Sequence, residues 1–309
     1  MRGSLLSVCL CAILGVVGMG SAAAKPGTIS ECGAILNEAG NYKLGADLTA
    51  CPGFAITIAA SGVSLNLRNH SITCDREDGR RDVGVEVLGV TDVHIRNGRI
   101  SNCDAGIELL QTRDSKVNNM ELTDNLLDPL LGGGFGLVTF QAVNNHINGN
   151  TASRNNTAGI ELFFSSGNKI NGNTASENFR SDDVPFPNFG IGIGVAFSNE
   201  NEIIGNQTNN NTDAGIALAN GSTGNIVRGN TANDNENYGI GMFSREDFQA
   251  PLAFGNLVQA NRAIGNGRAD LLEARFDPFG NPREEVQPDC VNTFKSNTYI
   301  TRIAPDLCF

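Results

Sequence analysis

Two stretches of the chain, NHINGNTASRN at residues 145–155 and NKINGNTASEN at residues 168–178, are nearly identical and decide the fold. In each, asparagine returns at every fifth position, and Asn168 follows Asn145 by 23 residues. Three later blocks repeat the triplet: Asn201/Asn206/Asn211, Asn225/Asn230/Asn235 and Asn256/Asn261/Asn266. A period of this length indicates a solenoid of stacked units.

A second signal, glycine followed by alternating apolar residues, separates these blocks. It is seen at Gly136, Gly159, Gly192, Gly215 and Gly239, with degenerate copies at Gly84 and Gly106. The apolar stretches are too short for helices, and the Asn and Gly between them tolerate the left-handed backbone of sharp bends. We therefore predict an all-β fold, a single-stranded right-handed parallel β-helix solenoid with disulfide-bearing terminal caps. One asparagine at the same bend of each rung would form a ladder of side-chain amides.

Composition narrows the classes of function. The 309 residues carry a formal net charge of −11, 6% aromatic residues and no tryptophan. An acidic chain lacks the basic face that the phosphate backbone requires, so we expect no nucleic-acid partner.

The N-terminal segment of the chain indicates export. Residues 1–24 are typical of a secretory signal, with Arg2 before an apolar core and Ala22-Ala23-Ala24 at the cleavage site, and we expect their removal. No later segment is apolar enough to cross a bilayer, so the expected location is secreted or periplasmic. We divide the rest into an N-terminal cap with the first rung (25–74), the β-helix (75–285) and a C-terminal cap (286–309).

Six cysteines remain after cleavage: Cys32, Cys51, Cys74, Cys103, Cys290 and Cys308. An even number in an exported chain predicts disulfides, because the compartment is oxidising. Sequential pairing is favoured, although other connectivities are possible. A metal site is the weaker alternative, because the sequence contains no CxxC and no cluster of histidines.

Insertions at 126–134 and 179–189 both follow the third asparagine and precede the glycine-apolar strand, while a third, at 244–254, follows that strand. In this respect the chain resembles the pectate-lyase-like superfamily, whose long loops flank the first strand. The resemblance implies that a groove beside this strand binds polysaccharide. The ends, from Cys32-Gly33 to Cys51 and from Asp289-Cys290 to Tyr299, resemble exported bacterial β-helix repeat proteins. The periplasmic β-helix proteins of nitrous-oxide-reductase maturation share the repeat style.

Outward positions on the glycine-apolar strand form a column that includes three carboxylates. Glu86 and Glu108 should be adjacent and Glu161 two rungs further along, at about 4.8 Å per rung. Carboxylates this close either hold a cation, for which calcium is suited, or raise one pKa. We predict Glu108 and Glu161 as catalytic and Glu86, with Phe140 and Phe163 of the next outward column, as substrate-binding. The alternative is a solvated face without a ligand.

The resemblance adds further candidates. Polysaccharide lyases of this fold neutralise the uronate carboxylate with a cation or arginine and use a basic side chain on the C5 proton. Arg154 and Arg180 have suitable chemistry, and four aspartates in or beside the insertions could bind calcium: Asp124, Asp128, Asp182 and Asp183. The motifs of polygalacturonases and alginate epimerases are missing, and Asn211-Thr212-Asp213 is interpreted as the end of an asparagine triplet.

Two functions follow. The first is an exported protein that binds a polysaccharide or envelope glycan, with lyase, epimerase or hydrolase activity. The second is a non-catalytic surface or periplasmic scaffold that binds protein or envelope components. A basic column on the second strand, with His94, Lys116, His146 and Lys169, is interpreted as charge balance or as a place for an anionic polymer.

Overall fold

We analysed a computed structural model, which describes residues 24–76, 80–128, 132–180, 189–245, 252–276, 282–283 and 291–303. Regular structure in these ranges consists of strands. The described ranges hold no helix with the length and apolar character needed to cross a membrane.

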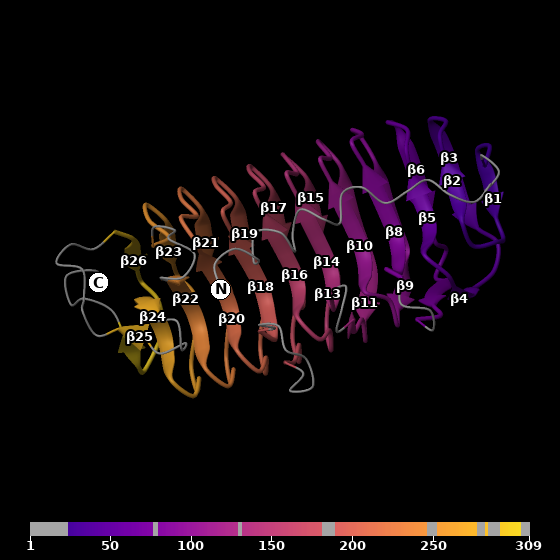
Figure 1. The fold of residues 1–309 in the computed structure, drawn as a ribbon. Helices are drawn as coiled ribbons and strands as arrows, with labels where there is room; N and C mark the ends of the chain where they lie inside the picture. Colours follow the sequence, from indigo (N-terminus) through magenta and orange to yellow (C-terminus); the bar gives the residue numbers. More distant parts are fainter. Residues whose placement is uncertain are drawn as a thin grey trace, which may run out of the picture.

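Two long sheets run the length of the molecule (Figure 1). In order, sheet A contains β2 (Ala34–Leu36), β5 (Phe54–Ile58), β8 (Val83–Leu88), β10 (Ala105–Leu110), β14 (Phe135–Phe140), β16 (Ala158–Phe163), β18 (Ile191–Ala196), β20 (Ala214–Ala219), β22 (Tyr238–Arg245), β24 (Ala269–Phe276) and β25 (Pro282–Arg283), with β27 (Arg302–Ile303) paired to β24. Sheet B contains β1 (Gly27–Ile29), β3 (Gly40–Leu44), β6 (Val63–Asn66), β9 (His94–Ser101), β11 (Lys116–Thr123), β15 (His146–Asn148), β17 (Lys169–Asn171), β19 (Glu202–Ile204), β21 (Ile226–Arg228), β23 (Leu257–Gln259) and β26 (Thr293–Lys295), with β4 (Leu48–Cys51) and β7 (Ser71–Cys74) beside β9. A separate hairpin joins β12 (Leu127–Asp128) and β13 (Gly132–Gly133).

The chain alternates between the two sheets, so each turn of the coil adds one strand to each. From β2 to β24 every pairing within sheet A is parallel, as in β10 with β14 and β16 with β18. This arrangement is the predicted right-handed parallel β-helix. The third wall of each rung is mostly single bridges, such as Thr151 with Thr174. A third regular strand does not form in this rung, because only three residues separate Asn150 from Arg154 and leave too little chain between two bends.

Three asparagine ladders, not one, line the corners of the coil. Asn168 Oδ1 accepts hydrogen bonds from both the backbone nitrogen and Nδ2 of Asn145, at 2.9 and 3.0 Å, and Asn168 Nδ2 donates to Asn201 Oδ1 at 2.9 Å. The ladders are Asn145/168/201/225/256/292, Asn150/173/206/230/261/297 and Asn125/155/178/211/235/266. Because these buried amides bond to one another along the axis, their polar atoms are satisfied without water.

Small aliphatic side chains fill the interior: Ala152, Ala175 and Ala232 are fully buried, as are Ile147 and Ile170. The disulfides Cys32–Cys51 and Cys74–Cys103 confirm two of the three predicted pairs, whereas Cys290 and Cys308 lie outside the described residues. The segment expected as the N-terminal cap already contributes β1 to β7 to the two sheets. Parallel coiling therefore begins near Gly27.

Candidate functional site

The register of sheet A places the predicted carboxylates in one outward column. Glu86 is paired with Glu108, Glu108 with Val138, and Val138 with Glu161. The expected spacing along the coil is therefore confirmed.

Glu86 and Glu108 share the cation of Arg81. Glu108 is 3% exposed and forms an ion pair with the Arg81 guanidinium. Burial raises the pKa of Glu86 to about 7, and the charge of Glu108 adds to the rise, against a smaller lowering by Arg81 and by a hydrogen bond from Thr57. At neutral pH Glu86, beside the ion pair of Glu108 with Arg81, is therefore protonated about half of the time.

Glu161 is the carboxyl group of the column that is buried without a partner from the described residues. Its side chain folds over the backbone of Gly194 on the next rung, in space that any larger residue would occupy. It is 7% exposed, and no hydrogen bond or ion pair reaches it from the described residues. Burial raises its pKa to about 8, so Glu161 is mainly a neutral carboxylic acid at pH 7.

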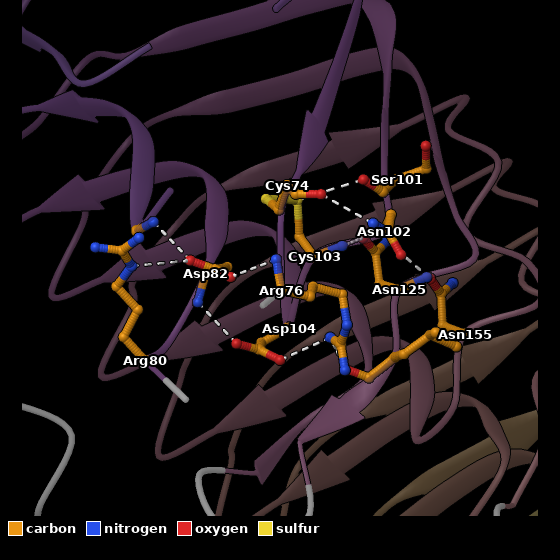
Figure 2. Close-up of polar contacts among 12 residues, drawn as sticks. Cys74, Arg76, Arg80, Asp82, Ser101, Asn102, Cys103, Asp104, Asn125 and Asn155 are labelled. Atoms are coloured by element: carbon orange, nitrogen blue, oxygen red, sulfur yellow. Dashed lines mark hydrogen bonds and ion pairs between the residues drawn. A yellow bond between two sulfur atoms is a disulfide. The ribbon is translucent and has the colours of Figure 1, made fainter. Parts of the chain in front are cut away.

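A network of arginine and aspartate residues surrounds the turn that leads into β8 (Figure 2). Arg76 Nη1 donates to Asp104 Oδ1 at 2.8 Å, and Asp104 Oδ2 accepts from the backbone nitrogen of Asp82 at 2.7 Å. Asp82 Oδ2 in turn accepts from the backbone nitrogen of Arg76 at 3.0 Å. Burial raises the pKa of Asp104 to about 6. The network and the adjacent Cys74–Cys103 disulfide hold the turn that presents Arg81.

The next outward column is apolar. Leu88, Leu110, Phe140 and Phe163 are paired in that order on consecutive strands. Leu88 is 46% exposed, and the other three are half-buried. At the corner after sheet A, Phe164 is 46% exposed and stacks on Phe197 with ring centroids 4.9 Å apart. This side of the face therefore offers apolar contact.

A second polar cluster, which the sequence did not reveal, borders sheet A further along. Asn237 Nδ2 donates to Asp213 Oδ1 at 3.0 Å. Burial raises the pKa of Asp213 to about 6, partly offset by this hydrogen bond and by the charges of Arg180 and Arg268. Burial also raises the pKa of Tyr238, whereas Arg268 lowers it. The available signal was Asn211-Thr212-Asp213, which the repeat explained equally well.

The other predicted residues are dispersed. Arg154 forms a bidentate pair with Asp124, at 2.9 and 3.0 Å, on the corner before β14 and β16, and makes no contact with Glu108 or Glu161. Arg180 lies beside Asp213 instead. Asp128 is in the β12–β13 hairpin, and Asp182 and Asp183 lie outside the described residues. Calcium binding by these aspartates stays a prediction.

The fold and the arrangement of its outer faces define a right-handed parallel β-helix protein. Residues 53–266 match the model of a family described as periplasmic copper-binding protein (NosD), and the chain belongs to that family. No curated protein matches the sequence.

Solved structures support the same fold. The periplasmic alginate epimerase AlgG is 14% identical, with a TM-score of 0.53 over 84% of this chain and 69% of AlgG. The A-module of the mannuronan C-5 epimerase AlgE6 from Azotobacter vinelandii is 13% identical, with a TM-score of 0.57 over 91% of this chain and 88% of that module. The Dettilon tailspike protein (gp208) is 14% identical, with a TM-score of 0.52 over 86% of this chain and 61% of the tailspike.

The described residues do not fit the copper of the family description. Copper is held by histidine nitrogen and by cysteine or methionine sulfur. The four described cysteines are oxidised to disulfides, and Met120 and Met242 are buried in the core. His94 on β9 and His146 on β15 are separated by β11, which places Lys116 between them. In the described ranges, no group of three His, Cys, Asp or Glu residues is close enough together to hold a metal ion.

Proposed function

We propose that this protein binds an acidic polysaccharide along the outer face of sheet A, in the periplasm, and exchanges protons with it. The observation that carries the proposal is the separation of protonation states within one column. Glu108 forms an ion pair with Arg81, whereas burial raises the pKa of Glu86 to about 7 and that of Glu161 to about 8. Neighbouring carboxyl groups with separated pKa values are the usual basis of acid–base chemistry.

The same protonation states make an acidic ligand acceptable to an acidic protein. The net charge of −11 would repel a polyanion from most of the surface. On this face Arg81 neutralises Glu108, and the neutral acids Glu86 and Glu161 can donate hydrogen bonds to a carboxylate. Binding should therefore weaken as pH rises and these two groups ionise.

The shape of the face favours a linear polymer. Outward side chains repeat at about 4.8 Å along the coil, so an extended chain parallel to the axis meets an equivalent position on each rung. Leu110, Phe140 and Phe163 lie alongside the carboxyl column and offer apolar contact to the C–H faces of sugar rings. The mannuronan C-5 epimerases of similar fold act, by their names, at C-5 of such a polymer, which gives uronate chains as the substrate class to test.

The chemistry that fits is proton transfer at C5 of a uronate. Arg81, which lies against Glu108, donates a hydrogen bond to the sugar carboxylate and draws negative charge from C5. Glu161, two rungs further along, donates to the carboxylate of a neighbouring sugar. A base removes the C5 proton, and the electron pair of that bond passes into the carboxyl group. Return of a proton on the opposite face gives the C5 epimer, whereas expulsion of O4 gives an unsaturated sugar. We assign the acid–base pair to Glu86 and Glu108.

The test is incubation of the mature protein with mannuronan, polygalacturonate and, as a neutral control, dextran at pH 6 and 8. Binding is read as retardation in gels that contain the polymer, epimerisation by proton NMR, and elimination by the ultraviolet absorbance of the product. Glu86→Gln should abolish product, whereas the matched Glu121→Gln, on the exposed third wall, should not. Retention of the polymer without any product would support a protein that binds the polysaccharide but does not catalyse a reaction on it. Neither retention nor product on any uronate polymer would end the proposal.

A further inference from the structure

The outer face of sheet B carries a column of basic residues on four consecutive strands. Register pairs His94 with Lys116, Lys116 with His146, and His146 with Lys169. On the following strand Glu202 takes the same position, and its carboxylate lies 3.9 Å from Lys169 Nζ. Both side chains are partly exposed, at 44% and 39%, so water screens the pair and leaves Lys169 able to meet another anion.

The permanent charges of this column are the lysines. Burial lowers the pKa of His94, and the nearby charges of Arg96 and Lys116 lower it further. His94 Nε2 also lies 3.1 Å from Asn118 Nδ2. The neutral imidazole is therefore a hydrogen-bonding member of the face at neutral pH.

Three asparagines form a second outward column beside the basic one. Asn118, Asn148 and Asn171 are paired on β11, β15 and β17 and are half-buried. The Oδ1 atom of each is buried, and no donor from the described residues reaches it. An unsatisfied buried acceptor costs about 1–3 kcal/mol.

These outward amides differ from those of the ladders inside the corners. Asn173 Oδ1, two residues after Asn171, accepts hydrogen bonds from both the backbone nitrogen and Nδ2 of Asn150. Stability therefore accounts for Asn173 but not for Asn171. Because the oxygen is the buried end of each outward amide and Asn118 Nδ2 already meets His94, the Nδ2 groups of Asn148 and Asn171 are the ones left for a partner outside the protein.

We propose that the outer face of sheet B, from β9 to β17, is a second binding site for an acidic polysaccharide, separate from sheet A. The face offers hydrogen-bond donors from Lys116, Lys169, Asn148 and Asn171. A ligand that matches them carries anionic oxygens at intervals along an extended chain, because the donors repeat at about 4.8 Å per rung. The net charge of −11 disfavours a nucleic acid, whose dense phosphates would be repelled over the rest of the surface.

The test separates this face from sheet A by paired substitutions. The double variant Lys116→Gln/Lys169→Gln is compared with Lys43→Gln/Lys295→Gln, which changes net charge equally on the distant strands β3 and β26 of the same sheet. Probes are polygalacturonate, dextran sulfate, neutral dextran and vesicles of phosphatidylglycerol. Affinity is measured by gel retardation at low and moderate salt, and circular dichroism checks folding.

We expect the first double variant to bind both acidic polymers about tenfold more weakly at low salt, with the control unchanged. Any product formed on sheet A should be retained, so failure here is distinguishable from failure of the proposed function. Two results would overturn the inference: equal loss in the two double variants, or Lys116/Lys169-dependent binding to the vesicles but not to the polymers.

Discussion

The free energy of unfolding should fall as pH rises from 6 to 8, and replacing Glu161 with glutamine should make this fall smaller. Burial raises the pKa of this carboxyl group from 4.5 to about 8 on folding. The folded state therefore binds a proton that the unfolded chain has released, and stability falls with rising pH throughout this window. At about 1.4 kcal/mol per pH unit, levelling off near pH 8, the loss between pH 6 and 8 is about 2 kcal/mol.

Urea unfolding at pH 6 and pH 8 measures this loss directly, because the free energy of unfolding is obtained by linear extrapolation. Glu86, Asp104 and Asp213 also titrate in or near this range, but they do so equally in both proteins. The quantity of interest is therefore the difference between the two pH dependences. Glu121→Gln, which removes an exposed carboxylate, serves as the control and should leave the slope unchanged. Parallel slopes for the native chain and Glu161→Gln would refute the buried, neutral state of Glu161.

Four further substitutions test the same physical reasoning. Asn173→Ala should cost about 3 kcal/mol or more in urea unfolding, because it strands buried donors and acceptors, whereas Asn171→Ala should cost less than about 1 kcal/mol. Gly194→Ala places a methyl group where the Glu161 carboxyl group lies, so the carboxyl group must turn towards water and the loss of stability between pH 6 and 8 should shrink. Burial alone would raise the pKa of Asp270, but the four N–H groups that donate to its carboxylate lower it overall. Asp270→Ala should therefore lower the free energy of unfolding at pH 7. This loss should shrink as pH falls below about 4, where the Asp270 carboxylate of the native chain takes up its proton. An equal loss at acid pH would count against stabilisation by the ionised carboxylate.

The coil and the columns on its faces were predictable because one period controls them. Once Asn145 and Asn168 are placed on equivalent corners, every residue between them has a defined wall and a defined side. The same counting placed Glu86, Glu108 and Glu161 in line before any coordinates. It missed two of the three ladders because a five-residue spacing was assigned to one bend per rung, whereas each asparagine of the triplet occupies its own corner.

The electrostatics of the site could not be predicted in this way. Arg81 precedes β8, outside the regular repeat, and no spacing rule places its guanidinium on Glu108. Arg154 has the right chemistry but lies on a corner, where Asp124 of the preceding rung takes its charge. A pKa depends on burial and on partners brought in by turns, and these vary from rung to rung while the period does not.

The repeat also explains why function concentrates in one part of the coil. Its interior requires only amides at corners and aliphatics between them, so the outward positions are free to vary without loss of fold. On sheet A the carboxyl column ends at Glu161 and continues as Gly194, Ala217 and Gly241. On sheet B the last lysine of the basic column is Lys169 on β17, and Glu202 takes its position on the next strand. Both faces therefore carry their polar groups between β8 and β17, so we infer that a long polymer with one stretch along sheet A and another along sheet B meets both. If so, the Lys116/Lys169 double variant and Glu161→Gln should weaken binding of a long chain more than additively, while binding of short oligomers, too short to reach both faces, should respond to each substitution alone.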